Sequence, residues 1–145
     1  MNNRISRIGP HVYVKRSVEA IKLYKKAFGL EEKGKPAMDN DGNVYYQMLE
    51  KNGEFFIGVS EDKYLQDALK NDSAADVRLN MVFTVAFERE DDLRKTFDLL
   101  NEEGNPSTGL IAQPNAAIYC DLVDKFGVCW CLFVPDNWNL KVVPK

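Results

Sequence analysis

The chain contains one histidine, His11, and three cysteines, which lie close together near its C-terminal end. Histidine titrates near neutral pH and can act as a general acid or base. Cysteine thiolates can bind zinc or act as nucleophiles. These four side chains are the first candidates for chemistry, with His11 the candidate catalytic residue and Cys120, Cys129 and Cys131 the thiols.

This small set of residues limits the possible chemistry. With one histidine, a single subunit cannot assemble a His-His-carboxylate triad or a multi-histidine zinc site. No serine lies in a G-x-S-x-G elbow, so a nucleophilic triad lacks support. A zinc site made of His11, Cys129 and Cys131 stays open as an alternative, although a C-x-C strand pair sets its sulfur atoms apart. The pattern favours pocket-wall thiols over metal or redox sites, and we expect no metal and no cofactor.

Hydrophobic periodicity predicts the elements that position His11. Residues 8–15 alternate as a strand, which places Val12 and Val14 under a helix and His11 and Tyr13 on the opposite, concave face. Ser17 is a candidate N-cap for that helix, which we expect to end at Gly29. Strands over 44–49 and 54–60 follow, joined by a tight turn at 51–53.

The same order of elements then repeats. We expect a strand over 79–87, a helix over 90–103 and three strands over 108–112, 116–123 and 128–134. Phe97 follows Tyr24 at an offset of 73, and Gly127 follows Gly53 at an offset of 74. This spacing indicates an internal duplication within one domain, residues 1–145. Its parts are module one, about 6–60, a connecting segment, 61–78, module two, about 79–135, and a C-terminal tail, 136–145.

Alternation in the second half predicts which side chains face the cavity. Met81, Phe83 and Val85 should face the second helix, whereas Asn80, Val82 and Thr84 should face the cavity. In the last strand, Trp130 and Leu132 should enter the core. The remaining side chains, Cys129, Cys131 and Phe133, should then face the pocket.

Two segments resemble a known family. The opening stretch ISRIGPHVYVKRSVEAIKLYKKAFG looks like the first strand and helix of vicinal oxygen chelate proteins, particularly their PhnB-like branch. The stretch YCDLVDKFGVCWCL resembles their closing hairpin, with Lys125 where a D-P-F-G turn usually has proline. The resemblance implies the α+β glyoxalase/bleomycin resistance fold. In this fold, two βαβββ modules form paired, curved mixed sheets with helices on the convex faces and a pocket on the concave face. The pocket is often completed by a homodimer partner.

The resemblance also supplies positions to test. Metal-dependent relatives hold a divalent ion with His, Glu or Gln from four strands. The equivalent positions fall near Gly9 or His11 in the first strand, and near Ile57, Asn80 and Cys131 in the others. Only His11 is a ligand of the usual kind. Members of the branch are also catalogued as ubiquinone-pathway methyltransferases, but this chain lacks the glycine-rich loop that binds adenosyl cofactors. The expected pocket residues are His11, Tyr13, Ile57, Asn80, Val82, Thr84, Tyr119, Cys129, Cys131 and Phe133.

Aromatic residues are frequent in the strands that would line this pocket. In each of the neighbouring pairs Tyr45/Tyr46 and Phe55/Phe56, strict alternation lets only one ring face the cavity. An aromatic wall with a few polar groups is typical of small-molecule sites. Rings that fill the core or a dimer seam are the alternative interpretation.

Composition excludes several other classes of partner. The net charge of −3, with no long run of Lys or Arg, makes nucleic acid an unsuitable partner. No apolar stretch is long enough for a signal peptide or a membrane span, and three clustered cysteines suit a reducing cytoplasm. We therefore expect a cytoplasmic homodimer.

Three functions fit this sequence. The first is a metal-independent protein that binds a small organic ligand. The second is a glyoxalase-type lyase or isomerase that uses His11, with or without a divalent metal. The third is a dimeric scaffold without a ligand.

Overall fold

A computed structural model describes residues 4–65, 81–106, 111–113 and 116–135 of the 145-residue chain. The chain divides into two compact units, Met1–Ser73 and Ala74–Lys145. Across the described residues, none of the helices has the length and apolar character needed to cross a membrane. Predicted pocket residue Asn80 lies outside the described residues.

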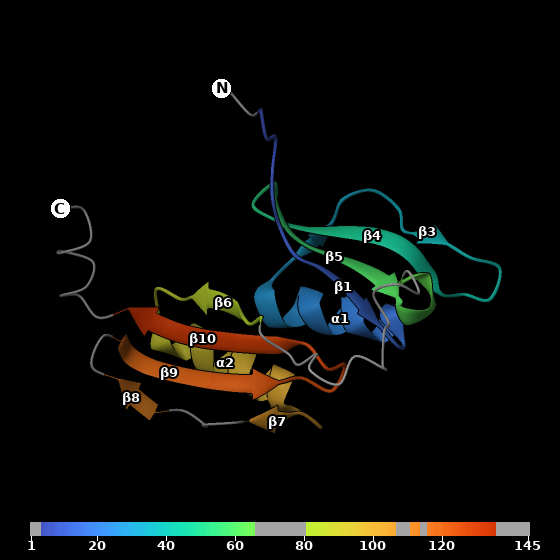
Figure 1. The fold of residues 1–145 in the computed structure, drawn as a ribbon. Coiled ribbons are helices and arrows are strands. Elements are labelled where there is room, and N and C mark those ends of the chain that lie inside the picture. Colours follow the sequence, from blue (N-terminus) through green and yellow to red (C-terminus); the bar gives the residue numbers. More distant parts are fainter. Residues whose placement is uncertain (1–3, 66–80, 107–110, 114–115, 136–145) are drawn as a thin grey trace. The chain divides into compact units, whose positions relative to one another are not determined.

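The first unit is a mixed sheet with one helix packed against it (Figure 1). Its strands follow the order β1-β5-β4-β2, with β1 parallel to β5, the other pairs antiparallel, and β3 paired with β4. The elements are β1 (His11–Val14), α1 (Ser17–Phe28), β2 (Glu31–Glu32), β3 (Ala37–Met38), β4 (Val44–Lys51), β5 (Glu54–Glu61) and the short 3-10 helix η1 (Asp62–Tyr64).

Alternation along β1 separates the core of this unit from its open face. Val12 and Val14 are buried together with apolar side chains of α1. His11 and Tyr13 line a cavity on the other face of the sheet. The predicted alternation of β1 is therefore confirmed. Apolar burial of about 25 cal/mol per Å² fixes the strand in this register, because a one-residue slip would expose the valines.

The start of α1 differs from the sequence prediction. Ser17 is the first residue of the helix and is not its N-cap, because Arg16 occupies that place in a left-handed conformation. Glu61, at the end of β5, instead accepts hydrogen bonds from the backbone N–H groups of Arg16 and Ser17 and from the Ser17 hydroxyl. A carboxylate from another strand thus satisfies N–H groups that the helix cannot pair internally. The helix ends at Gly29 as predicted, with φ of 65°.

The second unit is a second mixed sheet with one helix. Its order is β6-β10-β9-β7, with β6 parallel to β10 and β8 paired with β9. The elements are β6 (Phe83–Ala86), α2 (Glu90–Asn101), β7 (Asn105–Pro106), β8 (Ile111–Gln113), β9 (Ala116–Val123) and β10 (Cys129–Pro135). Met81 precedes β6 and is 66% exposed, so the expectation that it packs on the second helix is wrong.

The registers of the two units repeat one another. Helices α1 and α2 each contain 12 residues and start 73 positions apart. His11 pairs with Gly58 between β1 and β5, and Thr84 pairs with Cys131 between β6 and β10, again 73 positions later. In each unit the strand after the helix is divided into two short pieces, β2 and β3 or β7 and β8. The prediction of an α+β fold built from two βαβββ modules is therefore confirmed.

The turn between β9 and β10 is organised by one buried acid, Asp124. One of its carboxylate oxygens accepts hydrogen bonds from the backbone N–H groups of Phe126 and Val128, and the other accepts from Nε1 of Trp130 at 2.9 Å. Asp124 is only 3% exposed. The acid therefore joins the turn to the core through Trp130. These contacts do not use the backbone N–H of Lys125, so proline, which lacks that group, would also fit at this position.

Candidate functional site

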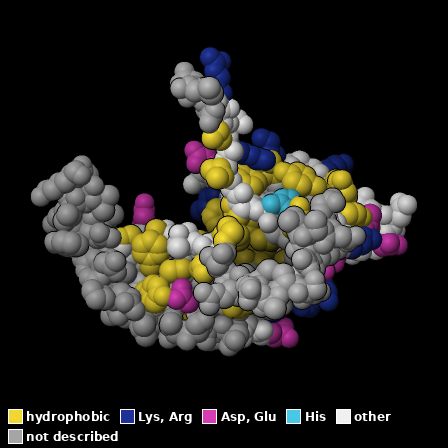
Figure 2. Space-filling model, in the orientation of Figure 1, with side chains coloured by type: hydrophobic (Ala, Val, Ile, Leu, Met, Phe, Trp, Pro, Cys, Tyr) yellow, Lys and Arg dark blue, Asp and Glu magenta, His cyan; other side chains and the backbone are white. Residues whose placement is uncertain are grey.

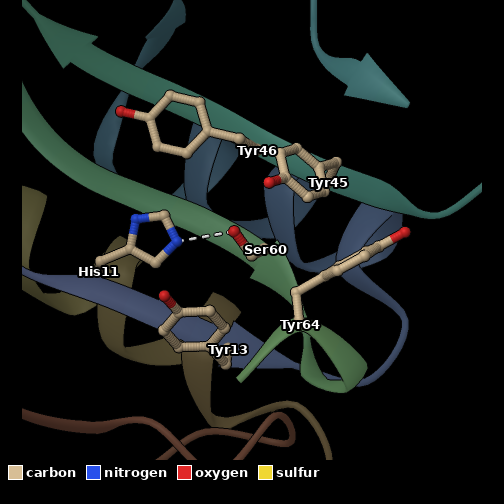
Figure 3. Close-up of a pocket in the computed structure, with 6 residues that line it drawn as sticks. All are labelled: His11, Tyr13, Tyr45, Tyr46, Ser60 and Tyr64. Carbon is tan, nitrogen blue, oxygen red and sulfur yellow. Dashed lines mark hydrogen bonds between the residues drawn. The ribbon is translucent and has the colours of Figure 1, made fainter. Parts of the chain in front are cut away.

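A cavity of about 410 Å³ lies on the open face of the first unit (Figure 3). Its volume falls in the range of about 300–1,000 Å³ that is usual for small-molecule pockets. The side chains that line it come from four elements, β1, β4, β5 and η1. These residues are His11, Tyr13, Tyr45, Tyr46, Ser60 and Tyr64. In Figure 2 the histidine, in cyan, is visible at the surface beside hydrophobic side chains.

His11 lies over a glycine on the neighbouring strand. A Cβ atom at Gly58 would lie only 2.3 Å from Nδ1 of His11, so the imidazole can occupy this place only because position 58 has no side chain. Nε2 of His11 and Oγ of Ser60 are hydrogen-bonded at 2.7 Å, with the donor set by the imidazole tautomer. Burial lowers the pKa of His11 below 6.5, and the ring is therefore neutral at pH 7.

Two groups of aromatic rings form the cavity wall. The His11 ring stacks on Tyr46 with an interplanar angle of 8° and centroids 5.4 Å apart, and it contacts Tyr13 at 4.8 Å with the planes tilted by 50°. Tyr45 and Tyr64 meet edge to face at 4.8 Å and 80°. Figure 3 shows these rings arranged around the hydroxyl of Ser60. The cavity is therefore aromatic on its sides and polar at its base.

Both Tyr45 and Tyr46 line the cavity, which corrects the expectation that only one of them could. The pairing of β3 with β4 shifts register there, because Ala37 pairs with Tyr46 whereas Met38 pairs with Val44. Such an irregularity interrupts the alternation of side chains along the strand. The bulge therefore adds a second tyrosine to the same wall.

Tyr64 is held in place by Asp39. The Tyr64 hydroxyl donates a hydrogen bond to Oδ2 of Asp39 at 2.6 Å, and Nζ of Lys63 lies 2.9 Å from the same oxygen. The other carboxylate oxygen accepts from the backbone N–H groups of Asp41 and Asn43. The bond from Tyr64, followed by those from Lys63 and the backbone, holds the pKa of Asp39 well below its usual range. The bond to Asp39 in turn raises the pKa of Tyr64 above 10.

Ile57 does not face this cavity, and its expected place in the pocket is wrong. It is fully buried on the same face of β5 as Val59, where the core lies, whereas Gly58 and Ser60 alternate onto the open face. A shift of one residue along a strand reverses the face of every side chain. The family position therefore corresponds to a core residue in this chain.

The remaining predicted pocket residues belong to the second unit. Trp130 and Leu132 are buried, and Cys129, Cys131 and Phe133 alternate with them on the more open face of β10, which confirms the predicted alternation. Val82 is 50% exposed before β6 begins. Thr84 lies beside Cys131, and Tyr119 pairs with Phe133. A pocket role for these residues stays a prediction.

On the open face of the second unit, Asp121 links two titratable groups. The Tyr119 hydroxyl donates a hydrogen bond to its carboxylate, which raises the pKa of Tyr119 to about 12. Burial, reinforced by the charge of Asp121, raises the pKa of Cys131 to about 12. Burial likewise raises the pKa of Cys120 to about 11 and that of Cys129 above 9.0. These thiols are therefore protonated near neutral pH and are poor nucleophiles.

The two described ligand positions of the first unit, His11 and Ile57, do not form a donor set that suits a divalent metal. Ile57 is an apolar side chain buried in the core and offers no ligand atom. The ring contacts of His11 are with tyrosines, and its hydrogen bond is with a serine hydroxyl. In the described ranges, no group of three or more His, Cys, Asp or Glu side chains could hold a metal ion. The described residues of the first unit therefore do not fit the metal that the family resemblance implies.

Sequence patterns did not identify Ser60 and Gly58 as part of this site. Both depend on the parallel register between β1 and β5, in which Tyr13 pairs with Ser60 and His11 with Gly58. The available signal was the glycine itself, since a glycine inside a strand often marks the close approach of another group.

Comparison with solved structures identifies the fold. Protein PA1353 from Pseudomonas aeruginosa has a TM-score of 0.71 and 16% identity, and the match covers 90% of this chain and 98% of that protein. A PhnB protein from Bacillus cereus gives a TM-score of 0.68 and 21% identity over 89% of this chain and 99% of its own. A glyoxalase/bleomycin resistance protein/dioxygenase family enzyme from Burkholderia phytofirmans has a TM-score of 0.63 and 9% identity. That match covers 87% of this chain and 95% of the enzyme.

These similarities show the glyoxalase/bleomycin resistance fold that the sequence resemblance implied. At 9–21% identity they carry no information on ligand or reaction. No family model and no curated protein matches the chain.

Proposed function

We propose that this PhnB-like chain of glyoxalase fold is a metal-independent binding protein for a small organic ligand, which occupies the cavity of the first unit. The observation that carries the proposal is the cavity itself. It has a volume of about 410 Å³ and combines four tyrosine rings with a neutral imidazole and one serine hydroxyl. Apolar walls with few polar groups are typical of small-molecule sites.

The polar groups of the cavity favour binding over metal chemistry. The hydroxyls of Tyr13, Tyr45 and Tyr46 have no hydrogen-bond partner among the described residues, and each can donate or accept a bond from a ligand. Rings give contact area at a low cost in side-chain entropy, because a tyrosine has few rotatable bonds. The site therefore supplies both area and orientation without a metal.

Thermal shift measurements with a library of small organic compounds, performed in the presence of EDTA, test this proposal. We expect at least one compound to raise the melting temperature of the wild-type chain. Tyr45→Ala removes a cavity ring that is 56% exposed, and it should reduce the stabilisation. The matched control is Val18→Ala, since Val18 is also partly exposed in the first unit but does not line the cavity. Stabilisation that is seen without EDTA but not with it, or equal stabilisation of both variants, would contradict the proposal.

A second candidate is a glyoxalase-type lyase or isomerase that uses His11. The observation in its favour is that the imidazole is neutral and in the cavity, hydrogen-bonded to Ser60 at 2.7 Å. A neutral imidazole can take a proton from a carbon next to a carbonyl group and return it to the neighbouring atom. The test is turnover of a hemithioacetal by the wild type and by His11→Ala. Turnover that survives the substitution would exclude this role for His11.

We further propose that the chain is a cytoplasmic homodimer. In support of the compartment, its cysteines are free thiols, as expected under reducing conditions. In support of the assembly, β1 and β2 end the sheet order of the first unit, and an edge strand is commonly covered by another element or chain. Light scattering on the purified chain measures the assembly, and a monomer at all concentrations would refute it. The ligand screen, and not the assembly state, separates the binding protein from a dimeric scaffold, which would dimerise without binding any compound.

A further inference from the structure

The wall of the cavity in the first unit is built from π-faces and lacks formal charge. Four of the six tyrosines of the chain line it, together with the imidazole of His11 and the hydroxyl of Ser60. None of the described lining residues is Lys, Arg, Asp or Glu. The face of an aromatic ring carries partial negative charge and attracts a cation within about 6 Å of the ring centroid. From this we infer that the cavity binds a compact organic cation, such as a quaternary ammonium group. The inference rests on the proposed function and names its ligand class.

The angles between the rings favour a compact ligand over a flat one. Tyr45 and Tyr64 stand at 80° to each other, and His11 and Tyr13 at 50°. A tetrahedral ammonium group can contact faces that point in different directions, whereas a planar ring stacks on one face at a time. The nearly parallel pair, His11 and Tyr46, is already in direct contact at 5.4 Å, so no third ring fits between the two.

The charges in contact with Tyr64, one of the cavity rings, also favour a cation. Asp39, which accepts the hydrogen bond of the Tyr64 hydroxyl, belongs to a cluster of two carboxylates and one ammonium group. Nζ of Lys63 lies 5.3 Å from the centroid of the Tyr64 ring and opposes a cationic ligand, but it is paired with both Asp39 and Asp41. Two negative charges against one positive charge leave this cluster with a net charge of −1. The hydrogen bond to Asp39 also enriches the π-electron density of the Tyr64 ring.

Binding of a cation should depend on the protonation of His11. The titratable groups in contact with the imidazole are Tyr13 on the same strand and Tyr46 on β4, and Ser60 on β5 is its hydrogen-bond partner. Above its lowered pKa the imidazole is neutral and compatible with a cation. As the pH falls through that pKa, the imidazolium places a like charge in the wall, and affinity for the cation should fall.

The test compares choline with its neutral isostere 3,3-dimethylbutan-1-ol, in which carbon replaces the charged nitrogen. Calorimetric titrations at a pH of about 8, where His11 is neutral, measure both affinities. Because a desolvated cation–π contact gives about 2 kcal/mol and 1.4 kcal/mol is a factor of ten, we expect choline to bind at least about tenfold more tightly. Choline, but not the isostere, should also lower the pKa of His11 in proton NMR titrations. The single histidine of the chain makes its signals unambiguous.

Substitutions at Tyr45 separate the ring from its hydroxyl. Tyr45→Phe keeps the π-face and should retain choline affinity within about twofold, whereas Tyr45→Leu removes the face and should weaken it about three- to tenfold. Val18→Ala serves again as the control outside the cavity. Equal affinities for choline and its isostere would overturn the inference. If neither compound binds but a neutral aromatic compound from the screen does, the cation inference fails and the proposed binding function stands. If no compound of any class binds, both fail.

Discussion

Substitution of Gly58 by alanine gives a sharp test of the described site. The added Cβ would lie 2.3 Å from Nδ1 and 3.0 Å from Cε1 of His11, whereas ordinary van der Waals contact begins near 3.4 Å. The imidazole must therefore move by about 1 Å or rotate away. Either movement breaks or stretches its 2.7 Å hydrogen bond with Ser60 and its stack on Tyr46. Loss of the bond costs about 1 kcal/mol, and loss of the ring contacts costs about 0.5–1.5 kcal/mol.

Local strand preference acts in the opposite direction. Alanine in a strand is favoured over glycine by about 0.5–1 kcal/mol, because glycine loses more conformational entropy on folding. The two effects differ in sign, and the steric one is larger. We therefore expect Gly58→Ala to lower the free energy of unfolding by about 1 kcal/mol, measured by urea unfolding followed by circular dichroism. The displaced ring should leave its half-buried place, and in NMR titrations the pKa of His11 should rise back toward 6.5.

A double-mutant cycle with His11→Ala provides the control. Without the imidazole the new methyl group no longer meets the ring that Gly58 accommodates, so Gly58→Ala should then be neutral or stabilising by about 0.5–1 kcal/mol. The coupling free energy between the two positions should be about 1.5–2 kcal/mol. If Gly58→Ala stabilises the chain equally with and without His11, the described packing of the imidazole is refuted.

Three further substitutions or measurements test other parts of the structure. Glu61→Gln weakens the cap of α1 and should lower the free energy of unfolding in urea by about 1 kcal/mol. Glu54→Gln, at the exposed start of the same strand, is the control and should have no effect. Equal losses of stability in the two variants would refute the cap. Asp124→Asn presents an amide N–H₂ group or a displaced oxygen to Nε1 of Trp130, and it should lower the free energy of unfolding by about 2–3 kcal/mol. An unchanged NMR resonance of the indole N–H would argue against the hydrogen bond. With a pKa of about 12, the Cys131 thiol should react with a disulfide reagent far more slowly in the folded chain near pH 7 than in the chain unfolded in urea. In the folded chain the reaction should become faster as the pH rises toward that pKa. Rapid labelling of the folded chain near pH 7 would contradict this prediction.

Features of the fold that depend on local periodicity could be predicted from sequence. Val12 and Val14 alternate with His11 and Tyr13 on β1, and the same rule separates core from open face on β10. Gly29 ends α1 because its left-handed conformation is accessible to glycine at low cost. The duplication was also readable, since the order of helices and strands is a property of each half separately.

Features that depend on distant pairing could not be predicted. The carboxylate that caps α1 belongs to Glu61, 44 residues after Ser17, and no local pattern links them. Tyr45 joins Tyr46 in the cavity wall because β3 shifts the register of β4. Ile57 was placed in the pocket by family position, and a difference of one residue in register was enough to put it in the core. In each case the deciding interaction crosses between strands.

The repeat of one backbone pattern in the two units allows the cavity residues of the first unit to be compared with their counterparts in the second. The constant offset of 73 makes Thr84 the counterpart of His11 and Cys131 the counterpart of Gly58, and both pairs occupy the same register between parallel strands. In the first unit a glycine makes room for a large ring. In the second unit a short hydroxyl side chain lies beside a thiol. The backbone pairing at these positions is the same in the two units, and the paired side chains differ in size and chemistry.

Tyrosines at equivalent positions of the two units differ in the contacts of their hydroxyl groups. Tyr46 in the first unit and Tyr119 in the second are also 73 positions apart. Tyr46 stacks on the imidazole of His11, and its hydroxyl has no partner in the described part of the chain, whereas the Tyr119 hydroxyl bonds to Asp121. A tyrosine at this strand position therefore offers its hydroxyl to a ligand only where a neighbouring ring, and not a carboxylate, supports it. On this reasoning the proposed binding of a ligand in the cavity depends on the pairing of His11 with Gly58, and the fold alone would not provide it.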